Sequence, residues 1–212
     1  MILSLAAMAT ALVVATGCEP IPTDQQEDPG GSAAGEAAEA DAQARLAKLT
    51  VAKAGSMRGY KRERFPHWRS TGENCDVRDT VLKRDGTKVK VSGCNVVAGS
   101  WRSVYDDTTL NSPTKVDIDH VVPLANAWRS GASGWTTAKR EDFANDVDRP
   151  QLIASSQTSN RSKGDQDPST WKPKTTSTWC EYAEDWIEVK SYWKLTVTTA
   201  EKSALTDMLG KC

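Results

Sequence analysis

The chain has 212 residues, of which 38% are hydrophobic and 26% are charged, and its mean hydropathy is −0.54. Such a chain is long enough for about one globular domain plus a leader or tail, and its composition excludes a multi-span membrane protein, a collagen-like fibre and a wholly disordered chain. Seven acidic residues precede the first basic residue, Arg45. Residues 45–212 therefore contain the remaining 21 acidic residues and all 27 lysines and arginines. This part of the chain therefore carries a net charge of about +6, which mildly favours a polyanionic partner.

Residues 2–17 are uncharged and apolar apart from small serines and threonines. The run has the length of the apolar region of a signal peptide and is short for a membrane-spanning helix of about 20 residues. It leads through Ala-Thr-Gly to Cys18, which resembles a bacterial lipobox. We expect residues 1–18 to be a lipoprotein-type signal peptide and Cys18 to be acylated, so that the lipid anchors the chain to the membrane. Cleavage nearby and free secretion is the alternative, and in either case the chain is predicted to be extracytoplasmic.

Residues 19–44 are rich in Pro, Gly, Ala, Gln and acidic residues and show no apolar periodicity. Such a segment cannot bury enough apolar surface to offset the entropy of ordering, so we expect an acidic, disordered linker. The globular domain is predicted to occupy residues 45–212. A short helix over 42–53 is predicted at its start, because Leu46 and Leu49 recur at helical spacing.

Four cysteines follow Cys18, namely Cys75, Cys94, Cys180 and Cys212. An even number of cysteines in an exported domain predicts two disulfides, for which three connectivities are possible. We favour the pairs that are local in the sequence, Cys75 with Cys94 and Cys180 with Cys212. A zinc site is the rival interpretation, but the chain has no Cys-x-x-Cys pair and its two histidines do not lie near the cysteines in sequence.

The other elements of the domain are predicted from apolar spacing, capping residues and turn residues. In chain order they are a strand or hairpin over 79–91 that turns at Asp85 and Gly86, a strand over 116–122, helices over 124–129 and 137–147, a strand over 151–154, a helix from Ser155 or Ser156 to Lys163, a helix over 179–193, and a last helix that begins at a Thr198/Glu201 capping box and ends near Gly210.

His120 is the candidate general base, because a neutral imidazole can take a proton from water near neutral pH. It lies in the predicted strand 116–122, whose alternation places Asp117 and Asp119 on the opposite side from His120. Asp119 and Asn160 carry hard oxygens that suit Mg²⁺, and such an ion neutralises the charge that develops when a phosphodiester is cleaved. Asp117 is interpreted either as a carboxylate that supports a metal ligand or as a solvated strand residue.

The sequence DIDHVVPL at 117–124, followed by a strand and then by a helix with SNRSKGD at 159–165, resembles the H-N-H nucleases of the ββα-metal (His-Me finger) superfamily. The stretch 59–212, which includes GYKRERFPHW, CDVRDTVLKRDG and NDVDRPQLIA, is similar to the exported H-N-H family related to the C-terminal nuclease domain of GmrSD-type restriction enzymes. The resemblance implies an α+β fold with a ββα-metal core and surrounding helices. It also implies an endonuclease in which His120 activates water while Asp119 and Asn160 hold one Mg²⁺ or Mn²⁺ ion.

The group that orients His120 stays open at this point. In the commonest H-N-H pattern, an asparagine between the two strands often orients the base. Asn145 and Arg149 both lie near that place in this chain and are the candidates for the role.

Several basic side chains are candidates for contact with substrate phosphates. Arg161 and Lys163 follow Asn160 on the predicted helix and are the preferred ones, whereas Arg78 is a weaker one; a charged, solvated helix face is the alternative. His67 lies among aromatic residues with no carboxylate at ligand spacing, and it is interpreted as structural.

Together these features predict hydrolysis of phosphodiester bonds in nucleic acid, with DNA as the expected substrate and RNA not distinguished from it. Low sequence specificity is expected, because nothing resembles a reader helix or a zinc finger. The principal rival is a non-catalytic cell-surface lipoprotein that binds wall polysaccharide through its tryptophans. A nuclease directed at modified DNA is a further alternative, against which the shortness of the chain argues.

Overall fold

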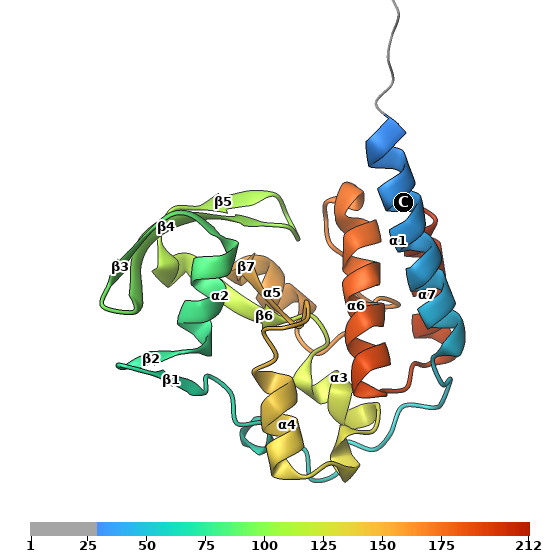
Figure 1. Ribbon diagram of the computed structural model, residues 1–212. Coiled ribbons are helices and arrows are strands. Elements are labelled where there is room, and N and C mark those ends of the chain that lie inside the picture. The colour runs from blue at the N-terminus through green and yellow to red at the C-terminus, as the bar shows by residue number, and fades with distance from the viewer. Residues whose placement is uncertain (1–28) are drawn as a thin grey trace, which may run out of the picture.

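The computed structural model describes residues 29–212, so the predicted leader, Cys18 and the first part of the predicted linker lie outside the described residues. The fold class is α+β, as predicted. Three small sheets and their covering helices form one region, and three long helices packed side by side form the other (Figure 1). Among the described helices, none combines the length and the apolar character that crossing a bilayer requires.

The centre of the first region is a strand, strand and helix unit. Strand β6 (Val116–His120) pairs in antiparallel register with β7 (Leu152–Ser156), and helix α5 (Gln157–Lys163) packs against both strands. Helix α5 begins where the side chain of Ser156 accepts a hydrogen bond from the backbone of Ser159, and it ends before Gly164, which has a φ of +55°. The predicted elements lie within two residues of these bounds.

Helix α2 (Val77–Asp85) and a three-stranded sheet, β3 (Gly86–Ser92), β4 (Asn95–Ser103) and β5 (Thr108–Leu110), pack on the β6–β7 pair. They share a core with its apolar side chains, which include Leu82, Trp101, Ile118 and Leu152.

The strand or hairpin predicted over 79–91 is therefore wrong in its first half. Asp76 and Asp79 form a capping box, which satisfies exposed backbone N–H groups and makes residues 77–85 helical. The hairpin turn lies instead at Gly93, between β3 and β4.

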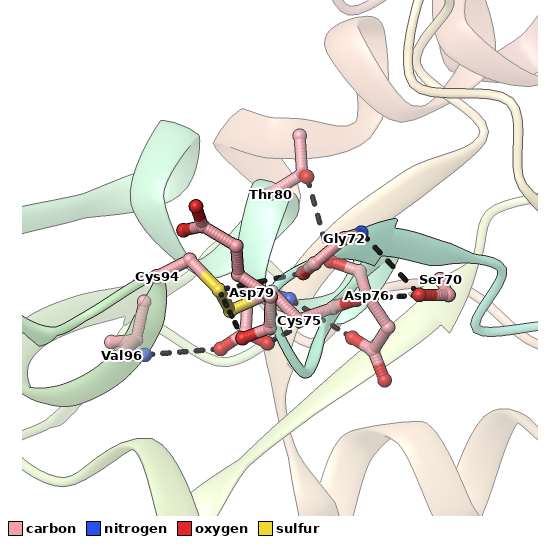
Figure 2. Close-up of a disulfide and its surroundings, with 9 residues drawn as sticks. Ser70, Gly72, Cys75, Asp76, Asp79, Thr80, Cys94 and Val96 are labelled. Carbon is pink, nitrogen blue, oxygen red and sulfur yellow. Dashed lines mark hydrogen bonds between the residues drawn. A yellow bond between two sulfur atoms is a disulfide. The ribbon is translucent and has the colours of Figure 1, made fainter.

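Both predicted disulfides are present. Cys75 of the short strand β2 (Cys75–Asp76), which pairs with β1 (Ser70–Gly72), is bonded to Cys94 at the β3–β4 turn (Figure 2). Close to this bridge, Asp79 also accepts a hydrogen bond of 3.0 Å from the backbone of Val96. The second bridge joins Cys180, near the start of helix α6 (Trp179–Trp193), to Cys212.

The second region consists of α1 (Pro29–Lys48), α6 (Trp179–Trp193) and α7 (Thr199–Leu209) (Figure 1). Helix α6 has the predicted bounds, and the predicted Thr198/Glu201 capping box begins α7. The apolar faces of the three helices share one core with residues of the adjoining short helices.

Helix α1 differs from prediction at both ends. It begins at Pro29, so residues 29–44 are helical where a disordered linker was expected; their many alanines are strong helix formers, and Ala42 is buried. It ends at Lys48 and not at residue 53, because Val51 is extended and pairs with Val197.

Short elements connect the two regions. Helix α3 (Leu124–Arg129) follows β6, and α4 (Thr137–Ala144) ends three residues earlier than predicted because the Asn145 side chain donates to the backbone of Glu141. The 3-10 turns are η1 (Arg62–Arg64), η2 (Pro113–Lys115), η3 (Ala132–Gly134) and η4 (Thr176–Thr178).

Candidate active site

A cavity of about 340 Å³ opens at the end of β6, beside the C-terminal end of α5. Asp119, His120 and Asn160 all line it, so the three residues predicted to act together do lie around one space. Asp119 and His120 contact different elements, as the alternation of a strand predicts, yet both reach the cavity because it lies where the strand ends.

His120 is buried, and its ring is held in one orientation. The Nε2 atom donates a hydrogen bond of 3.0 Å to the backbone carbonyl of Ala144. Because a carbonyl only accepts, Nε2 carries the proton and Nδ1 is the basic nitrogen. Burial lowers the pKa of His120 to about 3; the hydrogen bond to Ala144 opposes the shift, and the charge of Arg62 adds to it. The imidazole is therefore neutral at pH 7.

Asp119 is held through one of its two carboxylate oxygens. Its Oδ2 atom accepts from the hydroxyl of Tyr105 at 2.7 Å and lies 2.7 Å from Nζ of Lys163, whereas Oδ1 has no hydrogen-bond partner among the described residues. Lys163 is fully buried and also donates to the backbone carbonyl of His120 at 2.9 Å. Burial lowers the pKa of Lys163, and the Asp119 carboxylate opposes that shift.

Asn160 projects from α5 and is oriented by a carboxylate on β6. Its Nδ2 atom donates to Oδ2 of Asp117 at 3.1 Å. The hydrogen bond assigns the amide nitrogen to Asp117 and leaves the amide oxygen of Asn160 for another partner. Of the two interpretations of Asp117, this contact favours the carboxylate that supports a ligand.

The donor set suits a hard divalent cation. Asp119 offers a carboxylate oxygen that has no hydrogen-bond partner within residues 29–212, and Asn160 offers an amide oxygen at the same cavity. Mg²⁺ and Mn²⁺ prefer oxygen donors and commonly keep several waters, so two protein ligands are chemically adequate. The residues present therefore fit the ion that the sequence predicts.

The two candidates for orienting His120 lie elsewhere. Asn145 uses its side chain to join three backbone segments, at Pro66, Arg69 and Glu141. Arg149 pairs with Asp146 at 3.0 Å, and its guanidinium lies over the ring of Tyr192. Neither side chain lines the cavity.

The group that contacts the His120 ring is the carbonyl of Ala144, one residue before Asn145. The side-chain bonds of Asn145 hold the end of α4 that carries this carbonyl.

The three residues predicted to contact phosphates do not line the cavity either. Lys163 is fully buried in its ion pair with Asp119, so it is not available to a substrate. Arg78 donates to the backbone carbonyls of Pro113 and Val116 and supports the start of β6. Arg161 is exposed on α5 but does not line the cavity.

Residues 57–68 form a wall of the site that sequence reasoning missed. Met57, Tyr60 and Arg62 line the cavity, while the rings of His67 and Trp68 lie about 6 Å from that of His120, at centroid distances of 6.2 and 6.0 Å. His67 is thus a neighbour of the candidate base and not only a residue of the aromatic cluster. The local signal in the sequence is the dense motif GYKRERFPHW, but nothing in it indicates which residue it faces.

Comparisons with known proteins identify a family and a relative. The family described as GmrSD restriction endonucleases, C-terminal domain, matches residues 76–208, which include β6, β7 and α5. An uncharacterized secreted protein of Arthroderma benhamiae is 49% identical over 209 residues, which cover 98% of each chain. No solved structure matches the chain.

The secreted relative confirms the predicted extracytoplasmic location, because the similarity extends over nearly the whole length of both proteins. The family match covers well over half of the chain and contains all three residues that converge on the cavity from β6 and α5. The chain belongs to the family of the C-terminal domain of GmrSD restriction endonucleases.

Proposed function

We propose that this protein is an extracellular, metal-dependent endonuclease that hydrolyses phosphodiester bonds in nucleic acid with low sequence specificity. One observation carries the proposal: a neutral imidazole, a carboxylate with one oxygen that accepts no hydrogen bond from the described residues, and an oriented amide line the same cavity. A general base and a pair of hard metal ligands are what hydrolysis of a phosphodiester needs. Membership of a nuclease family supports the same reaction class.

His120 is the general base of the proposed reaction. Its Nδ1 atom accepts a proton from the attacking water as the new bond from oxygen to phosphorus forms. The bond from phosphorus to the departing sugar oxygen breaks, and that oxygen takes a proton from solvent. The carbonyl of Ala144 keeps Nε2 protonated throughout, so that Nδ1 is the nitrogen directed to this task.

Asp119 and Asn160 are the proposed ligands of one Mg²⁺ or Mn²⁺ ion. When bound, such an ion offsets the negative charge that accumulates on the phosphate and on the departing oxygen. Tyr105 and Lys163 hold one oxygen of Asp119 and so restrict its rotation, and Asp117 does the same for the amide of Asn160.

The expected substrate is DNA, with RNA as the outcome that a substrate panel distinguishes. The net charge of about +6 on residues 45–212 favours a polyanion, and contacts to the phosphate backbone carry no base information.

The rival function, binding of wall polysaccharide through tryptophans, finds little support in the surface of the protein. Three of the eight tryptophans, Trp101, Trp128 and Trp186, are buried, and the other five are partly buried. None of the eight side chains is fully exposed, so the surface offers limited indole area on which a sugar ring could stack.

The test is digestion of a supercoiled plasmid and of an RNA of similar length by the purified protein. We expect cleavage with Mg²⁺ or Mn²⁺, none with EDTA, and a rate lowered by about 10²- to 10⁴-fold in His120→Ala. The unfolding midpoint of the variant checks that it is folded. Intact nucleic acid in every condition, or wild-type cleavage by His120→Ala, would overturn the proposal.

A further inference from the structure

We propose that Arg62 is a substrate-binding residue, whose guanidinium holds a phosphate of the nucleic acid in the cavity beside Asp119 and His120. The inference rests on the proposed function and adds to it a residue outside the strand, strand and helix unit. Arg62 also precedes residues 76–208, to which the family match is confined.

The position of Arg62 is the first argument. It begins the turn η1, and it lines the cavity together with Asp119, His120 and Asn160. Phe65, directly after the turn, is fully buried and anchors this segment in the core. The side chain of Arg62 thus projects from a segment that Phe65 fixes in the core, and it lies at the edge of the proposed reaction site.

The second argument is the charge balance of the cavity. Its two acidic side chains already have cationic partners, since Asp119 pairs with Lys163 at 2.7 Å and Asp165 pairs with Arg129 at 2.6 Å. Arg62 has no acidic partner within 4 Å in the part of the chain that the structure describes.

Some arginines of the domain are held by partners, whereas Arg58 and Arg161 have no acidic partner within 4 Å among the described residues either, so the lack of a partner points to a ligand only because Arg62 lines the cavity. Arg69 pairs with Glu141 and with Asp142, Arg149 pairs with Asp146, and Arg140 is held by four hydrogen bonds to backbone and hydroxyl oxygens.

The chemistry of the side chain decides what it would bind. A guanidinium has a planar fork of N–H donors that matches two oxygens of a phosphate, and it is charged at neutral pH. A phosphodiester carries one negative charge, which an unpaired arginine at the cavity would neutralise. Because Arg62 lies at the same cavity as His120, a phosphate bound there is within reach of the candidate base.

The experiment compares Arg62→Gln, Arg62→Lys and the control Arg58→Gln. Arg58 is an exposed arginine of the same segment that does not line the cavity, so its variant removes the same charge nearby. Binding is measured by fluorescence anisotropy with a labelled DNA duplex over a series of salt concentrations, in the His120→Ala background to prevent cleavage. Cleavage is measured in the otherwise wild-type chain.

We expect Arg62→Gln to reduce the slope of log K against log salt by about 0.9, the value for one phosphate contact, and Arg58→Gln to leave it unchanged. Cleavage by Arg62→Gln should fall about 10- to 100-fold, as for loss of a charged hydrogen bond, with partial recovery in Arg62→Lys.

Equal slopes and equal cleavage in Arg62→Gln and Arg58→Gln would show a solvated surface arginine and overturn the inference, while leaving the nuclease proposal intact. Absence of cleavage by the wild-type chain would instead count against the proposed function, and the binding measurement would still test Arg62 by itself.

Discussion

Each of the two regions of the molecule contains one buried pair of a lysine with a carboxylate. Lys190 lies 2.6 Å from Glu201 among the long helices, and Lys163 lies 2.7 Å from Asp119 at the end of β6. Both lysines are fully buried. The pairs are nearly identical in distance and burial, yet they differ in how completely the carboxylate is occupied.

Glu201 uses both of its oxygens within the protein. Oε1 accepts from the indole of Trp186 at 2.6 Å and faces Lys190, while Oε2 accepts from the backbone of Thr198 at the start of α7. This carboxylate is satisfied and holds two helices together.

In the described part of the chain, Asp119 is contacted only at Oδ2 and lines a cavity, so its second oxygen is left for a partner from outside. The comparison teaches that the number of occupied acceptor atoms, and not burial or ion pairing, distinguishes a structural carboxylate from a candidate ligand.

The largest expected effect comes from removing each lysine in turn. Lys163→Met and Lys190→Met should each lower the free energy of unfolding by about 3–5 kcal/mol in EDTA, because each leaves a buried carboxylate without its counter-charge. Adding Mg²⁺ or Mn²⁺ should stabilise Lys163→Met more than it stabilises the wild type, since Asp119 then has no ammonium competing for the ion. Lys190→Met should gain no more than the wild type does.

Chemical denaturation of the three proteins, with and without the cation, measures this difference. A ligand present at 100 times its Kd contributes about 2.7 kcal/mol to the free energy of unfolding, a difference large enough for the method to measure. If the cation raised the free energy of unfolding equally in both variants, Asp119 would be no more able to bind an ion than Glu201.

A smaller effect is expected at the second proposed ligand. Asp117→Ala should raise the metal concentration needed for half-maximal cleavage by about 10- to 100-fold, the range for loss of a group that orients a ligand. The rate at saturating metal should change little, because His120 is untouched.

Asp117→Asn is the matched control. Its amide oxygen can still accept from Nδ2 of Asn160, so the metal dependence should stay near that of the wild type. Identical metal titrations for Asp117→Ala and the wild type would remove the supporting role of this carboxylate.

The elements that sequence reasoning predicted well have local causes. Helix α6 follows from apolar side chains at helical spacing, α7 from a capping box, and the β6, β7 and α5 unit from short strands and a serine cap. The two disulfides join cysteines close in sequence. Asp119, His120 and Asn160 were predicted as a set from their residue types and from the resemblance to H-N-H nucleases, and they line one cavity.

The rest depends on packing between distant segments. Lys163 looks like part of a charged helix face, and only the approach of α5 to β6 shows that it is buried against Asp119. Arg62 and Trp68 reach the site from a segment more than fifty residues before His120, which no local pattern indicates. The base is held by the backbone of Ala144, and a backbone carbonyl leaves no signature in a sequence.

The smallest predicted effect is a change in stability with pH, and it concerns a second acid of the helical region. Asp185 on α6 has no basic partner within 4 Å among the described residues, unlike Glu201. Burial, and then the neighbouring charges of Glu181, Glu188 and Glu184, raise the pKa of Asp185 to about 8, with Arg84 opposing. Asp185 and Arg45 of α1 line one surface groove, but Arg45 forms an ion pair with Asp41 at 2.6 Å.

Because its ordinary pKa is 3.8, Asp185 loses its proton in the unfolded chain well before it does so in the folded one. The unfolded chain therefore binds fewer protons between about pH 4 and pH 8, and the free energy of unfolding falls as the pH rises through this window. Asp185→Asn removes this penalty. With allowance for solvent around a partly exposed side chain, we expect a gain of roughly 1–2 kcal/mol at pH 8 and little at pH 4. Thermal unfolding of the variant and the wild type at both values measures it, at about 2–4 °C in Tm for each kcal/mol. A gain of the same size at pH 4 would show that the effect is not linked to the proton of Asp185, and no gain at either pH would show that the helical region accommodates an unpaired acid without cost.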